Sequence, residues 1–243
     1  MNMDKTLFFD YGGTLDTNGV HWSEVLWQQY QAENVPVGKE QFLDSYVYAE
    51  RKLGNEPIID ADDTFVDVLR KKVWFETEML AENGFLDVQE ITRRAYVEHI
   101  ALRCDFHVRH NMERIKPMLS SLSEKYRLVL VSNFYGNLNS VLNAYGIQPF
   151  FTDVVESAQV GLRKPDAEIY RLAMDRSNTT PDKAVIIGDS VKNDIRPGLS
   201  LGATTVWLKG KGWGRDTSTG NENPVLPSFI ITDIMQLRDV LQP

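Results

Sequence analysis

The chain has 243 residues, of which 42% are hydrophobic, and a formal net charge of −8. This length and composition predict a globular protein with one large α/β domain or two smaller ones. The acidic excess argues against a nucleic-acid-binding surface, and no apolar run approaches the roughly 20 residues of a membrane span.

The only cysteine, Cys104, excludes an internal disulfide, which is typical of proteins from a reducing compartment. The N-terminal residues have one lysine, a very short apolar run and no small-residue cleavage pattern. They therefore do not resemble a secretory signal, and we expect a cytoplasmic protein.

The first predicted strand is the apolar stretch TLFFD, which ends at Asp10. From Trp22 to about His110 the apolar residues recur at helical spacing, and no convincing strand interrupts them. Breaks at residues 34–38, 54–57 and 83–84 divide this region into about four helices. The pattern predicts a small helical bundle inserted after the first strand.

From Met112 onward, short apolar runs alternate with helical ones. Continuous apolar strands separated by helices indicate a parallel sheet covered on both faces. A helix is expected to begin at Pro165, within the stretch KPDAEIYRLAM. The further strands are predicted at residues 127–132, 152–157, 184–189, 204–208 and 229–232.

Polar side chains follow several of these strands. Asp10 ends the first strand, Ser132 and Asn133 end the second, Asp189 ends the fourth and Asp194 follows five residues later. Lys164 stands just before a helix. Ligands of parallel sheets bind at the carboxyl ends of the strands, so we expect these groups to meet at one edge.

The charges at this edge suggest a chemistry. Three carboxylates repel one another in a partly buried site unless a divalent cation neutralises them, and oxygen ligands suit Mg²⁺. A hydroxyl, an ammonium and backbone N–H groups are able to hold a phosphoryl group. A carboxylate that the metal does not fully occupy is able to attack phosphorus and form an aspartyl-phosphate.

Four stretches, in order, resemble the motifs of the haloacid dehalogenase-like (HAD) hydrolase superfamily. They are FFDYGGTLD, LVLVSN, RKPDAEIY and VIIGDSVKNDIRPGLSLGATTVWL. The resemblance implies a Rossmann-like parallel-sheet core with helices on both faces, at residues 1–16 and 111–243. It also implies an inserted all-helical cap domain at residues 17–110.

The resemblance also implies roles for individual residues. Asp10 is expected to be the nucleophile and a Mg²⁺ ligand, and the backbone carbonyl of Gly12 a further ligand. Asp189 is expected to bind the metal directly, and Asp194 directly or through water. The residues expected to bind the phosphoryl group or support it are Thr14, Ser132, Asn133 and Lys164.

Gly12 departs from the family pattern. Most phosphatases of the superfamily have a second aspartate there, which protonates the leaving alcohol and later activates water. Such acid–base catalysis contributes ~10²–10⁴-fold. Three alternatives remain: His21 supplies the proton, Asp16 does similar work, or turnover is slow and suits activated leaving groups such as acyl phosphates.

We therefore predict a Mg²⁺-dependent phosphatase that acts on a small phosphorylated metabolite, with no nucleic-acid or membrane partner, as a monomer or homodimer. A first alternative is a phosphonatase-like C–P bond hydrolase, because such enzymes also have a small residue at the place of Gly12. They use a cap lysine as a Schiff base, for which the candidates are Lys39, Lys52, Lys71 and Lys72. A second alternative is a regulatory protein that binds phosphate ligands and has weakened catalysis.

Overall fold

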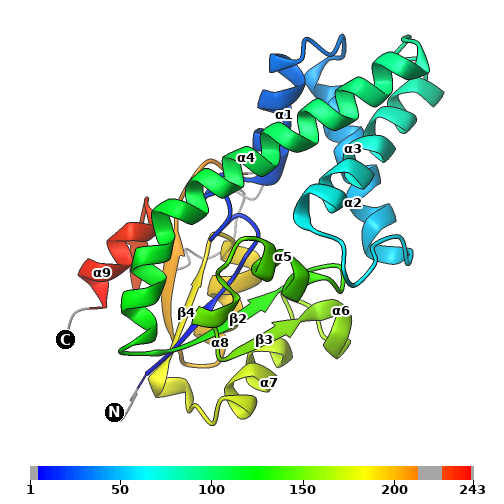
Figure 1. Ribbon diagram of the computed structural model, residues 1–243. Helices are drawn as coiled ribbons and strands as arrows, with labels where there is room; N and C mark the ends of the chain where they lie inside the picture. The colour runs from blue at the N-terminus through cyan, green and yellow to red at the C-terminus, as the bar shows by residue number, and fades with distance from the viewer. Residues whose placement is uncertain (1–4, 213–225, 242–243) are drawn as a thin grey trace.

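The computed structural model describes residues 5–212 and 226–241. Within these residues, six parallel strands form one sheet in the order β3-β2-β1-β4-β5-β6 (Figure 1). The parallel sheet expected from the sequence is confirmed. The strands are β1 (Thr6–Phe9), β2 (Arg127–Ser132), β3 (Asp153–Glu156), β4 (Ala184–Gly188), β5 (Thr204–Leu208) and β6 (Phe229–Ile231).

The strands have continuous apolar sequences because both faces of the sheet are covered. In β1, Leu7 and Phe9 belong to a core cluster on one face, whereas Phe8 belongs to a separate cluster on the other. All three side chains are fully buried. Alternate residues of a strand point to opposite faces, so two covered faces require an apolar residue at every position.

Helices account for most of the remaining chain. Of these, α4 and α5 lie on one side of the sheet and α7 and α8 on the other (Figure 1). The α-helices are α1 (Trp22–Ala32), α2 (Lys39–Asn55), α3 (Phe65–Glu82), α4 (Glu90–Ser123), α5 (Leu138–Ala144), α6 (Ser157–Val160), α7 (Glu168–Arg176), α8 (Arg196–Ser200) and α9 (Leu237–Val240). Shorter helical turns are η1 (Gln148–Phe150), η2 (Pro181–Lys183), η3 (Val191–Ile195) and η4 (Ile234–Gln236).

The start of α7 differs from the sequence expectation. The helix begins at Glu168 rather than at Pro165. The intervening residues form turns, and the Asp166 carboxylate accepts a hydrogen bond from the Glu168 N–H at 3.0 Å. A side chain that satisfies a free N–H of the first turn favours a helix start at that point.

The helices expected between the first two strands are present. We use the term helical insertion for residues 22–106, which comprise α1, α2, α3 and the first half of α4. Figure 1 shows α4 as a long helix that runs from the helical insertion down along the sheet. Because α4 is continuous from Glu90 to Ser123, it crosses the expected domain boundary at residues 110–111 without a break, and that boundary stays a prediction.

The carboxyl ends of β1, β2 and β3 point toward the side of the sheet where α5, α6 and the helical insertion lie (Figure 1). This edge is where the sequence places its polar residues. Among residues 5–212 and 226–241, no helix combines the length and apolar character that a bilayer crossing requires. The parts of the expected core at residues 1–4, 213–225 and 242–243 lie outside the described residues.

Candidate functional site

Asp10 occupies the centre of the carboxyl edge of the sheet. It directly follows β1, which lies between β2 and β4, and its backbone N–H donates to the carbonyl of Ile187 in β4 at 2.9 Å. The side chain is 6% exposed. A charged carboxylate is thus held at the end of a fully buried strand, where it needs a partner.

Lys164 provides that partner. Its Nζ lies 2.6 Å from Asp10 Oδ1 and 2.7 Å from Asp194 Oδ1, and the ammonium is almost completely buried. Ser132 Oγ, at the end of β2, donates to Asp10 Oδ1 at 3.2 Å. The structure therefore brings together four of the residues that the sequence selects, from four separate segments.

Asp189 and Thr14 complete the same cluster. The Thr14 hydroxyl lies 3.1 Å from Asp189 Oδ1 and 3.4 Å from Asp10 Oδ2, and it accepts from the Asp189 N–H at 3.1 Å. Thr14 therefore fixes the loop after β1 against the loop after β4. One carboxylate oxygen from each of Asp10, Asp189 and Asp194 lies within 4.8 Å of the others.

Asn133 supports the loop that carries Lys164. Its Nδ2 donates to the Lys164 carbonyl at 2.9 Å, and its Oδ1 accepts from the Lys164 N–H at 2.9 Å. This paired contact is a positioning role, because it orients the backbone from which the lysine side chain extends.

Sequence reasoning missed Tyr170. Its hydroxyl donates to Asp194 Oδ1 at 2.8 Å, while Asp194 Oδ2 accepts from the Ser190 N–H at 3.1 Å. With Lys164, these contacts engage both oxygens of Asp194. The helical pattern of α7 marks Tyr170 as a core residue, and nothing in that pattern separates a buried ring from a buried ring whose hydroxyl reaches the site.

The glycines of the site differ in whether the structure around them would tolerate a side chain. Gly13 has a φ of +89°, and a Cβ there would lie 2.5 Å from Asp189 Oδ2. At Gly188, a Cβ would lie 2.3 Å from Asp194 Cγ. Gly12 has neither constraint, since nothing lies within 4 Å of a Cβ built on it. The missing side chain at position 12 is therefore not required by the packing of the site.

Burial governs the electrostatics of the cluster. Desolvation raises the pKa of Asp10 to about 6, with a further rise from Asp194 that Lys164 opposes. Burial, followed by the charges of Asp10 and Asp194, raises the pKa of Asp189 well above its usual range. Although burial alone lowers the pKa of Lys164, the two neighbouring carboxylates raise it above its ordinary value.

The donor set fits a divalent cation. Three ionised carboxylates against one ammonium leave two negative charges in excess, and burial, together with the neighbouring carboxylates, raises the pKa values of Asp10 and Asp189. A set of carboxylate oxygens is the kind of ligand set that Mg²⁺ prefers. Asp10, Asp189 and Asp194 are the side chains that would hold it.

Asp16 lies beside the site but is fully engaged. Its Oδ1 accepts from the Gly13 N–H and its Oδ2 from Trp22 Nε1, both at 2.7 Å. The side chain is completely buried, and desolvation raises its pKa to about 7. These contacts connect the loop after β1 to the first turn of α1.

His21 is the N-cap residue of α1. Its Nδ1 accepts from the Ser23 N–H at 3.1 Å, its own backbone N–H donates to the Lys211 carbonyl at 2.9 Å, and its ring lies 5.9 Å from that of Tyr46. An accepting Nδ1 places the proton of the neutral ring on Nε2. The catalytic role of His21 stays a prediction.

The four candidate lysines of the helical insertion differ in their surroundings. Lys39 pairs with Glu24 at 2.7 Å, Lys52 with Glu56 at 3.6 Å, and Lys71 with Asp63. Lys72 pairs with Glu50, and only 6% of its side chain is exposed. Lys72 is thus the buried member of this set.

The profile of haloacid dehalogenase-like hydrolases matches residues 5–202. The chain belongs to this family. The match covers the cluster of Asp10, Ser132, Lys164, Asp189 and Asp194, so the motif positions and the geometry agree.

Curated relatives of this HAD-like hydrolase include phosphatases. A glyceraldehyde 3-phosphate phosphatase from Methanocaldococcus jannaschii is 43% identical over 97 residues, which are 40% of each chain. An N-acylneuraminate-9-phosphatase from Rattus norvegicus is 28% identical over 134 residues, covering 54% of this chain and 51% of the relative. The chain thus spans about two fifths to one half of the length of these relatives.

Solved structures agree in fold over nearly the whole chain. The putative HAD-hydrolase YfnB from Bacillus subtilis is 20% identical, with a TM-score of 0.58 over 98% of this chain and 99% of that one. A dehalogenase is 14% identical, with a TM-score of 0.61 over 98% and 96%. The expected fold class, with its inserted helices, is therefore confirmed.

Proposed function

We propose that this HAD-like hydrolase is a Mg²⁺-dependent phosphatase of the cytoplasm that acts on a small phosphorylated metabolite through an aspartyl-phosphate at Asp10. The observation that carries the proposal is the position of Lys164 between Asp10 and Asp194, 2.6 and 2.7 Å away. The curated phosphatase relatives support the reaction class. The YfnB structure, described as bound to magnesium, supports the choice of metal.

The first step uses the Asp10 carboxylate as the nucleophile. An oxygen of Asp10 forms a bond to phosphorus while the bond from phosphorus to the leaving oxygen breaks, and the leaving oxygen takes the electron pair. Ser132 and Lys164 hold the oxygens of the phosphoryl group. Mg²⁺ would be held by Asp10, Asp189, Asp194 and the backbone carbonyl of Gly12. When bound, it would neutralise negative charge on the phosphoryl oxygens.

The second step is hydrolysis of the aspartyl-phosphate. Water attacks phosphorus, the bond between phosphorus and the Asp10 oxygen breaks, and inorganic phosphate leaves with Asp10 restored. The Asn133 contacts keep the Lys164 backbone in place through both steps. Thr14 holds the Asp10 and Asp189 loops together.

His21 is the proton donor and acceptor in this proposal, in place of a side chain at position 12. In the imidazolium form, Nδ1–H donates to Ser23 Oγ, 2.8 Å away, and Nε2–H gives its proton to the leaving oxygen. The neutral ring that results has Nε2 as an acceptor, which takes a proton from the attacking water in the second step. Asp16 is less suited, because Gly13 and Trp22 engage both of its oxygens.

The phosphonatase alternative requires a lysine that reacts as a neutral amine. Lys72, the buried candidate, lies in an ion pair with Glu50. An ion pair stabilises the charged form of the lysine, so this contact favours the phosphatase function. Treatment with borohydride and phosphonoacetaldehyde distinguishes the two, because only a Schiff base is reduced to a stable adduct.

The deciding experiment measures phosphate release from a metabolite panel with Mg²⁺, for the native protein and Asp10→Asn. We expect turnover of at least one phosphate ester and its loss in the variant. Mg²⁺-dependent ligand binding without turnover across the panel would instead identify the regulatory alternative and overturn the proposal.

The role of His21 has its own test. His21→Gln should lower kcat for an alkyl phosphate about 10²-fold but affect acetyl phosphate much less, because a good leaving group needs little protonation. Equal losses on both substrates would contradict the acid–base role.

A further inference from the structure

A group of polar side chains lies inside the helical insertion, where apolar packing is otherwise the rule. The group joins α1, α2 and α3 to the loop that follows β2. We use the term polar cluster for its members: Tyr30, Tyr46, Glu50, Lys72, Glu76 and Tyr135.

The centre of the polar cluster is the ion pair of Lys72 and Glu50. Lys72 Nζ also lies 4.2 Å from the centroid of the Tyr46 ring, and the Tyr135 hydroxyl donates to Glu50 Oε2 at 2.8 Å. The Lys72 side chain is 6% exposed, whereas that of Glu50 is 35% exposed. The polar cluster is therefore buried at Lys72 and open at Glu50, so a ligand is able to reach it.

The polar cluster includes a buried carboxyl group, that of Glu76, whose hydrogen-bonding capacity is not fully used. Glu76 is fully buried, its Oε2 accepts from the Tyr30 hydroxyl at 2.9 Å, and its Oε1 has no hydrogen-bond partner. Desolvation raises the pKa of Glu76 to about 7. Buried polar groups left without full compensation are concentrated at functional sites.

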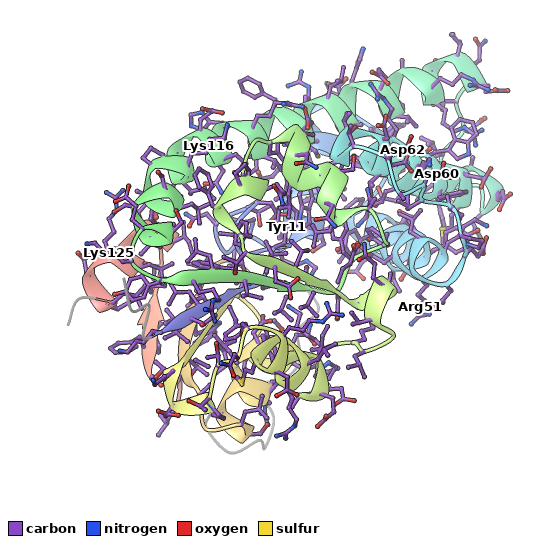
Figure 2. All side chains as sticks on the ribbon, turned by 60° about the horizontal axis from the view of Figure 1, so that its bottom comes forward. Tyr11, Arg51, Asp60, Asp62, Lys116 and Lys125 are labelled. Atoms are coloured by element: carbon purple, nitrogen blue, oxygen red, sulfur yellow. The ribbon has the colours of Figure 1, made fainter. Side chains whose placement is uncertain are left out.

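The position of the polar cluster connects it to the nucleophile. Tyr135 follows β2 three residues after Ser132, whose hydroxyl contacts Asp10. Between them, the Phe134 ring lies 5.7 Å from that of Tyr11, the residue next to Asp10. In Figure 2, Tyr11 lies near the middle of the molecule, between the sheet and the helical insertion. A short loop thus links the polar cluster to the candidate site.

The charges of the polar cluster limit what it can bind. Glu50 neutralises Lys72, and Glu76 adds a second carboxyl group, so the polar cluster offers no excess positive charge to a second anion. Its carboxylate oxygens and the Tyr135 hydroxyl oxygen accept hydrogen bonds, and its ammonium donates them. Acceptors beside donors match hydroxyl groups, each of which both donates and accepts.

We propose that the polar cluster binds the leaving group of the substrate, and that this group is a neutral, polyhydroxylated carbon chain such as a sugar or polyol. The inference rests on the proposed phosphatase function and names its substrate class. Glu50 and Tyr135, at the open side, contact the hydroxyl groups, and Lys72 holds Glu50 in position.

The test compares glycerol 3-phosphate with 3-phosphoglycerate. The second compound has a carboxylate where the first has a hydroxymethyl group. We expect kcat/KM to be at least about tenfold higher for glycerol 3-phosphate. Glu50→Gln and Tyr135→Phe should reduce kcat/KM for glycerol 3-phosphate about tenfold more than for acetyl phosphate, mainly through KM.

Arg51→Gln is the matched control, because Arg51 also belongs to α2 and directly follows Glu50 but is exposed. It should leave the selectivity unchanged. Preference for 3-phosphoglycerate, or equal losses on glycerol 3-phosphate and acetyl phosphate in both variants, would overturn the inference while leaving the phosphatase function intact. Absence of acetyl phosphate hydrolysis by the native protein would overturn both.

Discussion

The Lys164 ammonium bridges Asp10 and Asp194, and these two carboxylates belong to segments 184 residues apart in the chain. One cation thus compensates a carboxylate at the end of the β1 strand and another in the η3 turn after β4. The ion pairs are almost fully buried, so their energetics differ from those of surface salt bridges.

Lys164→Met should therefore be the most damaging single change at the site. It leaves two buried carboxylates without their cation, a change that costs about 3–5 kcal/mol of unfolding free energy. Phosphatase activity should fall by at least about 10³-fold. Urea denaturation and acetyl phosphate hydrolysis measure the two effects, with Lys183→Met on the exposed η2 turn as the control. Equal stability of the two variants would contradict the bridging role.

Gly12→Asp should add a second acid–base group to the one that the proposal assigns to His21. Because nothing lies within 4 Å of a Cβ at this position, the first side-chain carbon of an aspartate fits without moving its neighbours. Hydrolysis of glycerol 3-phosphate should rise up to about 10²-fold, since an alkyl leaving group gains most from protonation.

Gly12→Asn is the matched control, as it has the same size and lacks the ionisable group. A similar gain in both variants would show that filling the space, rather than proton transfer, raises the activity. A complete lack of phosphate release by the native protein, with a gain only in Gly12→Asp, would contradict the enzyme assignment in its present form.

The strands and the cluster of polar side chains at the carboxyl edge of the sheet were predictable from the sequence because they depend on local patterns. Continuous apolar runs identify strands buried on both faces, and parallel strands bring their carboxyl ends to one edge. Asp10, Ser132 and Asp189 each end such a run. Their meeting therefore follows from topology alone.

The polar cluster was not predictable in the same way. Glu50 and Lys72 lie on amphipathic helices, where a charged residue usually faces solvent. Whether such a residue points outward depends on the angles between helices, which the helical period does not determine. The sequence gives no sign that Lys72, unlike Lys71, is buried. Tyr135 reaches Glu50 only through the packing of the helical insertion on the core.

Glu76→Gln should stabilise the protein at alkaline pH. The folded-state pKa of Glu76 is about 7 and the ordinary value is 4.5, so between these pH values the folded protein holds a proton that the unfolded chain has released. The unfolding free energy therefore falls as pH rises from 4.5 to 7 and stays lower above that range.

Glutamine removes this dependence, because it does not ionise and its amide oxygen still accepts from Tyr30. At pH 8 the variant should be more stable by about 2–3 kcal/mol, and near pH 4.5 the two proteins should differ little. Urea denaturation of both proteins at the two pH values provides the measurement. A constant difference across this range would show that Glu76 does not titrate in the folded protein between pH 4.5 and 7.

Mg²⁺ should raise the melting temperature by neutralising the carboxylates of Asp10, Asp189 and Asp194. A ligand that binds only the folded state at 100 times its Kd adds about 2.7 kcal/mol, which is roughly 5–10 °C for a chain of this size. Thermal denaturation with MgCl₂, with EDTA and with KCl at matched ionic strength measures the effect.

Asp189→Asn is the informative variant, because it removes one ligand charge while Lys164 still pairs with Asp10 and Asp194. The Mg²⁺ response should shrink in this variant while its melting temperature in EDTA stays equal or rises, since one uncompensated buried charge is gone. An undiminished response in Asp189→Asn would show that Mg²⁺ stabilises the protein at a different place.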